Sequence, residues 1–502
     1  MCIRDRAYID GFQTSEGDVE IADGWGYESV VAMVKHWPGG GPEEGGRDAH
    51  YNYGKYSVYP GNNLKTHLIP FTEGAFKLNG PTQCAGAVMP YYTISYGIDP
   101  SGNNVGNNFS KYIITDLLRD KYGYDGIVCT DWGVTRDNEA VENFGGMCWG
   151  VETLSVADRH YMILKAGADQ FGGNNDKEPV LQAFQMGVKE FGEEAWNKRI
   201  RESARRLLMP MFRTGLFENP YLDVDKTKEI VGNKEFMRRG YEAQVKSLVM
   251  LKNKQSVLPV SDTGKKVYIP KRHFPSVVDF FGNTTKDYYD YPVNLDLVKK
   301  YYQVVDNPEE ADFAIVFIQG PMSGTGYDVA DREKGGNGYV PISLQYNDYT
   351  ANSARTTSIA GGDVKESFTN RSYKGKTVKT ANKDDLALVL NTRKQMKNKP
   401  VIVTLMATRP VIVGEFEKAA DAIVVSFGTS NEAFLDIISG KAEPSGLLPC
   451  QFPLNMETVE LQKEDIPRDM VPYVDSEGHA YDFAFGMNWQ GVINDERVQK
   501  YK

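Results

Sequence analysis

Short apolar runs alternate with segments of helical periodicity along the first half of the chain. Three of these runs have the length and composition of buried strands, and they occupy residues 29–37, 84–92 and 126–132. Between the last two, residues 109–123 carry apolar side chains at helical spacing and end at a glycine. Strands that alternate with helices predict a parallel sheet with crossover connections.

Two further patterns close the first half. Residues 162–170 have the pattern of a helix end, a glycine and a short strand, and residues 193–217 have that of a long amphipathic helix. We expect Pro210 to kink this helix or to end its regular part, because proline lacks a backbone N–H and clashes with the preceding turn. The polar and charged residues 218–240 that follow predict a linker.

The second half contains longer apolar runs. Residues 311–318, 400–406 and 421–427 are almost continuously apolar. Such runs are typical of central parallel strands that are covered on both faces. Helical patterns over residues 383–398 and 431–440 lie between or after these runs, so the second half also has the pattern of an α/β domain.

The patterns divide the chain into two α/β domains, residues 1–217 and 241–502, with residues 218–240 between them. The length of 502 residues agrees with this division, because it exceeds that of one ordinary domain. Within the second domain, the polar residues 346–382 predict a long loop or insertion.

Composition and charge exclude several functions. The formal net charge of −10 disfavours nucleic acid or an anionic membrane as the main partner, because both need clustered lysine and arginine. The five cysteines are odd in number and form no CxxC pair, so they indicate neither a zinc site nor a disulfide framework. No apolar run approaches the roughly 20 residues of a membrane span.

Residues that can take part in catalysis or binding lie at the ends of three of the predicted strands. They are Lys35 and His36, then Met89 and Tyr92, then Asp131 and Trp132. In a parallel α/β barrel, catalytic residues lie where the strands end. A cation, an imidazole, a phenol and a carboxylate beside an aromatic wall would bind a sugar, and the carboxylate of Asp131 would be a nucleophile for an anomeric carbon. The alternatives are that Asp131 caps a helix and that Trp132 packs in a core.

Glycine-rich residues 323–339 raise the alternative of a phosphate-binding loop. Their sequence is SGTGYDVADREKGGNGY, which lacks GxxxxGK[ST], and Gly324 and Gly326 have no third glycine at the dinucleotide spacing. An ordered active-site loop or a flexible insertion agrees better with this sequence.

A series of segments resembles, in the same order, the motifs of glycoside hydrolase family 3, the β-glucosidase group. The segments are VKHWPGGG, AVMPYYTISYG, YDGIVCTDWG, LKAGADQ, LLMPMFRTGLFENPY, SLVMLKNKQSVLPV, GTSNEAFLDIISGKAEPSGLLPCQFP and YDFAFGMNW. The matches run from about Tyr8 to Trp489. The resemblance implies that residues 1–217 are the C-terminal part of a (β/α)8-type barrel. It also implies that residues 241–502 are an αβα sandwich that supplies a loop over the barrel mouth.

The resemblance implies a retaining, exo-acting β-glycosidase without a cofactor or a metal. A β-glucosidase that hydrolyses terminal β-D-glucosyl residues of oligosaccharides or glucosides agrees best with the motifs. Asp131 matches the nucleophile. The residues that match the sugar-binding positions are Lys35, His36, Met89, Tyr92 and Trp132. A β-xylosidase, a β-N-acetylhexosaminidase and a non-catalytic carbohydrate-binding relative remain alternatives.

The acid that protonates the leaving group is the first departure from the family pattern. Many relatives carry SGEGY, with glutamate as the acid/base, where this chain has SGTGYD and therefore Thr325. The carboxylates that follow are Asp328, Asp331 and Glu333, and Glu333 is preferred narrowly among the candidates. Another branch of the family uses an Asp-x-His pair, which the stretch GRDAHY matches with Asp48 and His50.

The start of the chain is the second departure. Family members have several barrel strands before the KHFxG motif, whereas 34 residues precede Lys35 here and MCIRDR matches nothing in the family. We expect a truncated chain whose incomplete barrel exposes sheet edges and apolar faces, which would make it poorly stable and inactive alone. The compartment (periplasmic, secreted or cytoplasmic), the oligomeric state and the sugar preference stay open.

Overall fold

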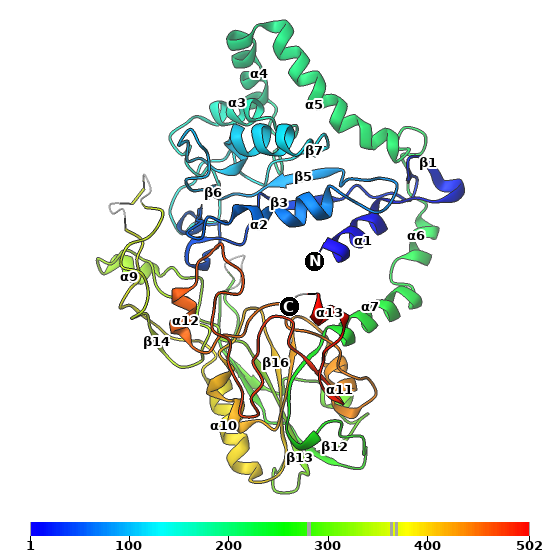
Figure 1. Ribbon diagram of the computed structural model, residues 1–502, viewed down its shortest axis with the longest axis vertical. Coiled ribbons are helices and arrows are strands. Elements are labelled where there is room, and N and C mark those ends of the chain that lie inside the picture. Colours follow the sequence, from blue (N-terminus) through cyan, green and yellow to red (C-terminus); the bar gives the residue numbers. More distant parts are fainter. Residues whose placement is uncertain (1, 279–282, 362–364, 367–369, 501–502) are drawn as a thin grey trace.

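The computed structural model contains two α/β halves that lie one above the other in Figure 1. It describes residues 2–278, 283–361, 365–366 and 370–500. The first half, coloured blue to green, passes into the second along one side of the molecule through α6 (Val224–Ile230) and α7 (Lys234–Ser247). Within the described ranges, no helix has both the length and the apolar character that crossing a membrane requires.

A three-stranded parallel sheet forms the centre of the first half, as the strand and helix pattern predicts. Its order is β3 (Met33–Trp37), β5 (Ala87–Pro90) and β7 (Ile127–Val128). The helix η6 (Tyr112–Lys121) connects β5 to β7 and buries its apolar face in the core. In β5 every side chain is buried, whereas β3 lies at the sheet edge with alternate side chains exposed.

The short strand predicted after β7 is reduced to a single bridge. Helix α3 (Val156–Ala166) ends at Gly167, whose φ of +110° is left-handed and suits a residue without a Cβ. The chain then returns to the sheet, where Gln170 pairs with Cys129 in parallel. The order of helix, glycine and sheet residue is therefore confirmed, although the pairing is too short for a strand.

The expected helix end at Pro210 does not occur. Helix α4 (Glu178–Phe191) is followed by α5 (Glu193–Arg213), which continues beyond Pro210 to the end of its last turn. Pro210 lies within one turn of the helix end, so its missing N–H removes only one of the last intrahelical hydrogen bonds.

The predicted linker, residues 218–240, is largely helical rather than irregular. It contains α6 and the first half of α7, and most of its side chains are exposed. Helix α7 packs on the second half, where the Tyr241 hydroxyl donates to Asp436 Oδ2 at 2.6 Å. The polar composition therefore predicted the exposure of this segment correctly, but it did not predict the helices. Asp223 and Asn233 cap these helices at their N-termini.

An eight-stranded mixed sheet forms the centre of the second half. Its order is β12 (Gln303–Val305), β9 (Lys266–Tyr268), β13 (Phe313–Gln319), β16 (Val401–Met406), β17 (Ala422–Ser426), β8 (Val249–Asn253), β18 (Met487–Asn488) and β19 (Gly491–Val492). The first five are parallel, and β8 runs antiparallel to β17. The three continuous apolar runs are thus confirmed as adjacent central strands, β13, β16 and β17.

Helices cover both faces of this sheet, which explains why its central strands have no polar side. Val316 of β13 belongs to the core beneath α10 (Asp384–Met396), whereas its neighbour Phe317 belongs to the core beneath α11 (Asn431–Ser439). Figure 1 shows these two helices on opposite sides of the strands.

The remaining elements are short. The helices are α1 (Cys2–Gln13), α2 (Leu64–Ile69), α8 (Leu295–Val298), α9 (Val329–Glu333), α12 (Met456–Leu461) and α13 (Glu496–Gln499). The strands are β1 (Glu20–Ala22), β2 (Trp25–Gly26), β4 (Tyr56–Ser57), β6 (Ile94–Ser95), β10 (Arg272–Phe274), β11 (Tyr288–Asp290), β14 (Tyr349–Thr350) and β15 (Thr377–Val378). The predicted loop, residues 346–382, contains only the small hairpin of β14 and β15 within its described part. Residues 2–6 contribute the start of α1.

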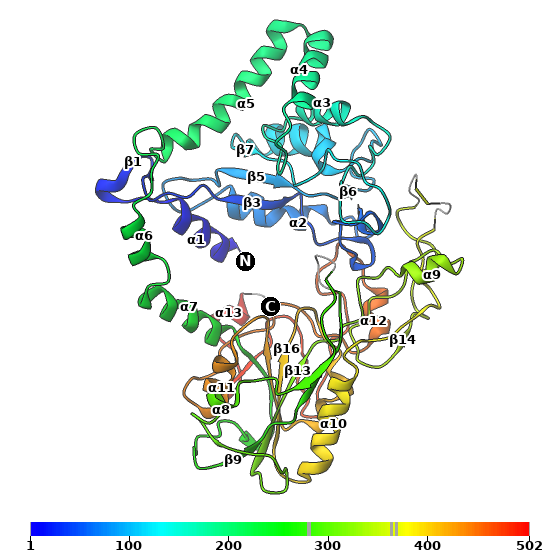
Figure 2. The same cartoon turned by 180° about the vertical axis from the view of Figure 1, so that it is seen from behind.

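Loops of the two halves also contact each other on the side away from α6. Asp465 accepts hydrogen bonds of 2.7 Å from the backbone N–H groups of Gly61 and Asn63. Arg332 pairs with Glu142 through both guanidinium nitrogens. The second half therefore packs on the loops that follow the strands of the first half, and Figure 2 shows this contact from the other side.

Candidate active site

Asp131 follows β7 at the point where the chain leaves the sheet. Its backbone N–H donates to Asn108 Oδ1 at 3.1 Å, and its carboxylate Oδ1 accepts the N–H of Trp132 at 2.8 Å. The residue is only 4% exposed. The backbone of the turn therefore holds one oxygen of this carboxylate in place.

The second carboxylate oxygen of Asp131 is buried without a hydrogen-bond partner among the described residues. It lies 3.3 Å from His36 Nε2, in a geometry that does not form a hydrogen bond. Burial raises the pKa of Asp131, and the Trp132 N–H, the Tyr92 hydroxyl and the charge of Lys35 oppose that rise. A buried acceptor without a partner is costly, so this oxygen is suited to contact a ligand.

His36 and Lys35 reach the carboxylate from β3. Burial, together with the positive charge of Lys35, lowers the pKa of His36 to about 4, so the imidazole is neutral near pH 7. Lys35 itself is exposed in the middle of the strand. The site thus combines a neutral donor or acceptor beside Asp131 with a solvated cation whose charge acts on Asp131.

Tyr92 and Trp132 complete the wall around the carboxylate. The Tyr92 hydroxyl donates to the Trp132 carbonyl at 2.9 Å, and burial raises the pKa of Tyr92, so the phenol keeps its proton. The Trp132 ring is 63% exposed and lies against Gly173, where a Cβ would approach the ring to 2.4 Å. Gly173 also has a φ of +63°. Both the close approach of the ring and this left-handed backbone conformation favour glycine at the position. Met89 is buried in β5, opposite Lys35.

Asp48 and His50 form a hydrogen-bonded pair beside Asp131. Asp48 Oδ1 lies 2.6 Å from His50 Nδ1 and accepts the His50 backbone N–H at 2.9 Å. The hydrogen bond with Asp48 and the negative charge of Asp131 raise the pKa of His50, although burial opposes them. The His50 ring lies 5.0 Å from the Tyr92 ring between centroids. These contacts orient an imidazole that is protonated more readily than a free histidine.

Glu333 and the other carboxylates of the second half occupy a different place. Glu333 is exposed at the end of α9. Within the described part of the chain, Glu333 makes no hydrogen bond or ion pair with Asp131. Asp328 caps α9, and Asp331 forms a 2.5 Å ion pair with Lys376. The structure therefore brings Asp48 and His50 to the nucleophile candidate, and it does not bring Glu333 there through any such contact.

Glu43, Tyr91 and Asn108 belong to the same region, but the sequence did not single them out for the site. Tyr91 donates its hydroxyl to Glu43, and Asn108 Nδ2 donates to the Tyr91 carbonyl at 3.0 Å. Asn108 is buried in the segment before η6. The one available signal for Glu43 was its place, shortly after the glycine run that follows His36.

Two cavities lie near these residues. A hollow of about 1180 Å³ opens beside β3, and Lys35, His36 and residues of α1 contribute to its lining. A second cavity, of about 320 Å³, lies between the two halves and is lined by Glu44, Arg47 and Tyr339 among others. Asp131 is not among the described residues that line either cavity, and the hollow beside β3 meets the site only through Lys35 and His36.

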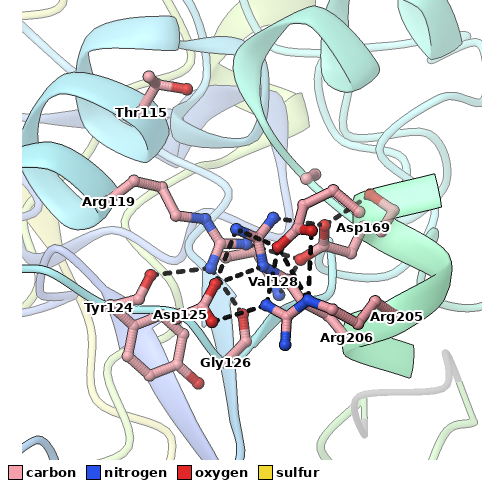
Figure 3. A network of polar contacts seen from close by, with 12 residues as sticks. Thr115, Arg119, Tyr124, Asp125, Gly126, Val128, Asp169, Arg205 and Arg206 are labelled. Carbon is pink, nitrogen blue, oxygen red and sulfur yellow. Dashed lines mark hydrogen bonds and ion pairs between the residues drawn. The ribbon is translucent and has the colours of Figure 1, made fainter. Parts of the chain in front are cut away.

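A network of charges beside β7 holds the strand that leads to Asp131. Asp169 accepts the backbone N–H of Val128 at 3.0 Å, an Arg119 nitrogen at 2.6 Å and the Ser203 hydroxyl at 2.6 Å. Figure 3 shows Arg119, from η6, and Arg206, from α5, pointing toward Asp169. One buried carboxylate thus ties two helices to the strand.

Comparisons with known proteins cover nearly the whole chain. The model described as "Glycosyl hydrolase family 3 N terminal domain" matches residues 5–209, and "Glycosyl hydrolase family 3 C-terminal domain" matches residues 248–489. A protein of Aspergillus flavus named "Probable beta-glucosidase C" is 34% identical over 95% of this chain and 62% of its own length.

Two further comparisons agree with these matches. The "Periplasmic beta-glucosidase/beta-xylosidase" of Dickeya chrysanthemi is 29% identical over 92% of this chain and 61% of its own length. The solved structure of an exo-1,3/1,4-β-glucanase from Pseudoalteromonas has a TM-score of 0.60 and 20% identity over 98% of this chain and 69% of that one. The chain spans about 62% of the length of the curated relatives it matches.

Proposed function

The chain belongs to glycosyl hydrolase family 3, and on that premise we propose that it is a retaining, exo-acting β-glycosidase. The reaction that we propose is the hydrolysis of terminal β-D-glucosyl residues, which is the activity named for the Aspergillus relative. In the same proposal, the sheet of β3, β5 and β7 is part of a (β/α) barrel over residues 1–217, and residues 241–502 are an αβα sandwich.

In the first step, the free carboxylate oxygen of Asp131 attacks the anomeric carbon of the sugar. The bond from that carbon to the leaving oxygen breaks, and the imidazolium of His50 gives its proton to this oxygen. In the second step, neutral His50 takes a proton from water, whose oxygen attacks the anomeric carbon and releases Asp131. Asp48 holds His50 in the orientation that both steps require.

The other residues of the site bind the sugar. Neutral His36 and the Lys35 cation are placed to hydrogen-bond hydroxyl groups on the side of β3, and Tyr92 lies beside the carboxylate. The exposed ring of Trp132 offers a flat apolar face for the C–H side of a pyranose or for the group attached to it. Met89 supports this wall from within β5.

One observation carries the proposal, namely the buried Asp131 oxygen that has no hydrogen-bond partner among the described residues. The large majority of buried side-chain polar atoms in proteins have a hydrogen-bond partner. Here one oxygen is held by the Trp132 N–H, and the other lies beside His36, in reach of the charges of Lys35 and His50.

Hydrolysis of an aryl β-glucoside by the wild-type chain and by Asp131→Asn tests the proposal. We expect the substitution to lower kcat by a factor on the order of 10⁴ or more, because the nucleophile is lost. Asp120→Asn is the matched control, since Asp120 is exposed on η6, and it should keep wild-type activity. Wild-type kinetics in Asp131→Asn would contradict the proposal.

A β-xylosidase is the second candidate, because the Dickeya relative is named for both activities. The same nucleophile would attack an aryl β-xyloside and an aryl β-glucoside. The two substrates differ in that only the glucoside carries a hydroxymethyl group. A higher kcat/KM for the xyloside would favour this second candidate, whereas a higher kcat/KM for the glucoside supports the first.

A further inference from the structure

Glu43 lies in the loop after β3 and connects two parts of the site. Its carboxylate accepts the hydroxyl of Tyr91, which directly follows β5. The backbone N–H of Ala49, the residue between Asp48 and His50, lies near enough to this carboxylate to lower the pKa of Glu43. One carboxylate therefore ties the segment that carries the Asp48–His50 pair to the end of the strand next to Asp131.

The groups that face Glu43 come from three elements. Asp48 and His50 face it from its own loop, and Tyr91 faces it from the end of β5. On the other side of Tyr91 lies the His36 ring of β3, with the ring centroids 4.9 Å apart. Burial raises the pKa of Glu43 to about 7, with the charge of Asp48 contributing and the Tyr91 hydrogen bond opposing.

We propose that Glu43 is a positioning residue that holds the Asp48–His50 pair against Asp131 and whose negative charge keeps His50 protonated. This inference rests on the proposed function only in giving His50 the role of the acid. Glu43 does not contact the sugar, and it acts through Ala49, Tyr91 and its field at His50.

The sign of the electrostatic effect follows from the charges. A negative Glu43 favours the imidazolium form of His50, as Asp48 and Asp131 also do. Glu43 becomes ionised as the pH rises through about 7, which is the range in which His50 would otherwise lose its proton. Removing the charge of Glu43 therefore moves the loss of the His50 proton to lower pH.

The neighbouring Glu44 provides a matched control. It is the same residue type, burial also raises its pKa, and it lies in the same loop. Its carboxylate, however, accepts the backbone N–H groups of Ile359 and Ala360 in the second half, away from Tyr91. A purely structural role of this loop would make both substitutions similar, whereas the proposal makes them different.

The first measurement is the pH profile of kcat/KM for an aryl β-glucoside with a poor leaving group. In Glu43→Gln we expect a fall of about tenfold at pH 8 and of less than about twofold at pH 5.5, because His50 loses its proton earlier. Glu44→Gln should keep the wild-type shape of the profile. Tyr91→Phe removes a hydrogen bond that lowers the pKa of Glu43, so it should change the profile in the same direction as Glu43→Gln but by less, because the carboxylate remains.

The second measurement does not need turnover. Carbon-13 labelling of the histidine rings allows the His50 titration to be followed by NMR in the unliganded chain, with His50→Gln used to assign its signal among the 6 histidines. The His50 pKa should be lower in Glu43→Gln than in the wild type and unchanged in Glu44→Gln.

These outcomes separate the inference from the proposed function. An equal His50 pKa in the wild type and Glu43→Gln would overturn the inference, even in an active enzyme. A lowered His50 pKa in a chain without glycosidase activity would support the inference about Glu43 and contradict the proposed function. An equal change of the His50 pKa in Glu44→Gln would also overturn the inference, because it would mean that Glu43 affects His50 only through the general structure of the loop.

Discussion

At the scale of single residues, one carboxylate oxygen of Asp131 accepts the Trp132 N–H, and the other has no hydrogen-bond partner among the described residues. Sequence reasoning identified Asp131 and its neighbours Lys35, His36 and Trp132 because each lies at the end of a strand-like run. It narrowly preferred Glu333 to the pair Asp48–His50 as the acid. That choice depends on how two loops fold in space, and neither loop has a periodic pattern.

A residue-scale prediction separates these two acids. We expect His50→Gln to lower kcat/KM about 10²–10³-fold for an aryl glucoside with a poor leaving group, and far less for the dinitrophenyl glucoside, whose leaving group needs no proton. Because its contact with Asp48 raises the pKa of His50 above 6.5, wild-type activity should fall only as the pH rises through that higher value. If Glu333→Gln showed this leaving-group dependence and His50→Gln did not, the assignment of the acid would be wrong.

Trp132 supports a second residue-scale prediction. The ring is 63% exposed, so Trp132→Ala should change the free energy of unfolding by less than about 0.5 kcal/mol. The lost stacking should raise KM by about tenfold, with a smaller change in kcat. Thermal melting and steady-state kinetics of the same preparations measure both quantities. A large loss of stability without a change in KM would mean that the ring serves packing instead.

At the scale of elements, the apolar patterns predicted the order of strands and helices in both halves. They were most accurate for β13, β16 and β17, where both faces are buried and the apolar runs are continuous. They overestimated β7, which pairs over two residues before the chain turns toward Asp131. A run of apolar residues reports burial, but it does not report where backbone pairing stops.

The Asp169 network gives an element-scale prediction about β7. Its side chain is fully buried against Arg119. Asp169→Ala leaves partly buried arginines without their partner, so it should lower the free energy of unfolding by about 3 kcal/mol. Urea denaturation measures this loss. Asp125→Ala, at an exposed carboxylate that pairs with Arg205 and Arg206, is the control and should cost less than about 1 kcal/mol. Equal losses in the two variants would show that Asp169 does not anchor the strand.

At the scale of the whole molecule, the two halves meet through loops that follow the strands of the first half. The sequence indicated two domains and an exposed connection, but their packing depends on contacts between residues hundreds of positions apart. Asp465 is one such contact: its buried carboxylate satisfies the N–H groups of Gly61 and Asn63. No local pattern reports a pairing at this separation.

Asp465→Ala tests the contact between the halves. Two backbone donors lose their acceptor, which should cost about 2–4 kcal/mol. Hydrogen exchange should increase around Gly61 to Asn63 more than in the cores of either half. Glu457→Ala, at an exposed position of α12, should leave exchange unchanged. Unchanged exchange in Asp465→Ala would mean that this contact does not hold the halves together.

The most direct test of the central claim is to trap the covalent intermediate. A 2-deoxy-2-fluoro-β-glucoside with a dinitrophenyl leaving group slows release from the nucleophile more than attack, so the glycosyl-enzyme accumulates. Mass spectrometry of the digested protein should then find one fluoroglucosyl group, attached to Asp131, and none in Asp131→Asn. Hydrolysis of the glucoside without a label on Asp131, or with the label on another carboxylate, would contradict the account.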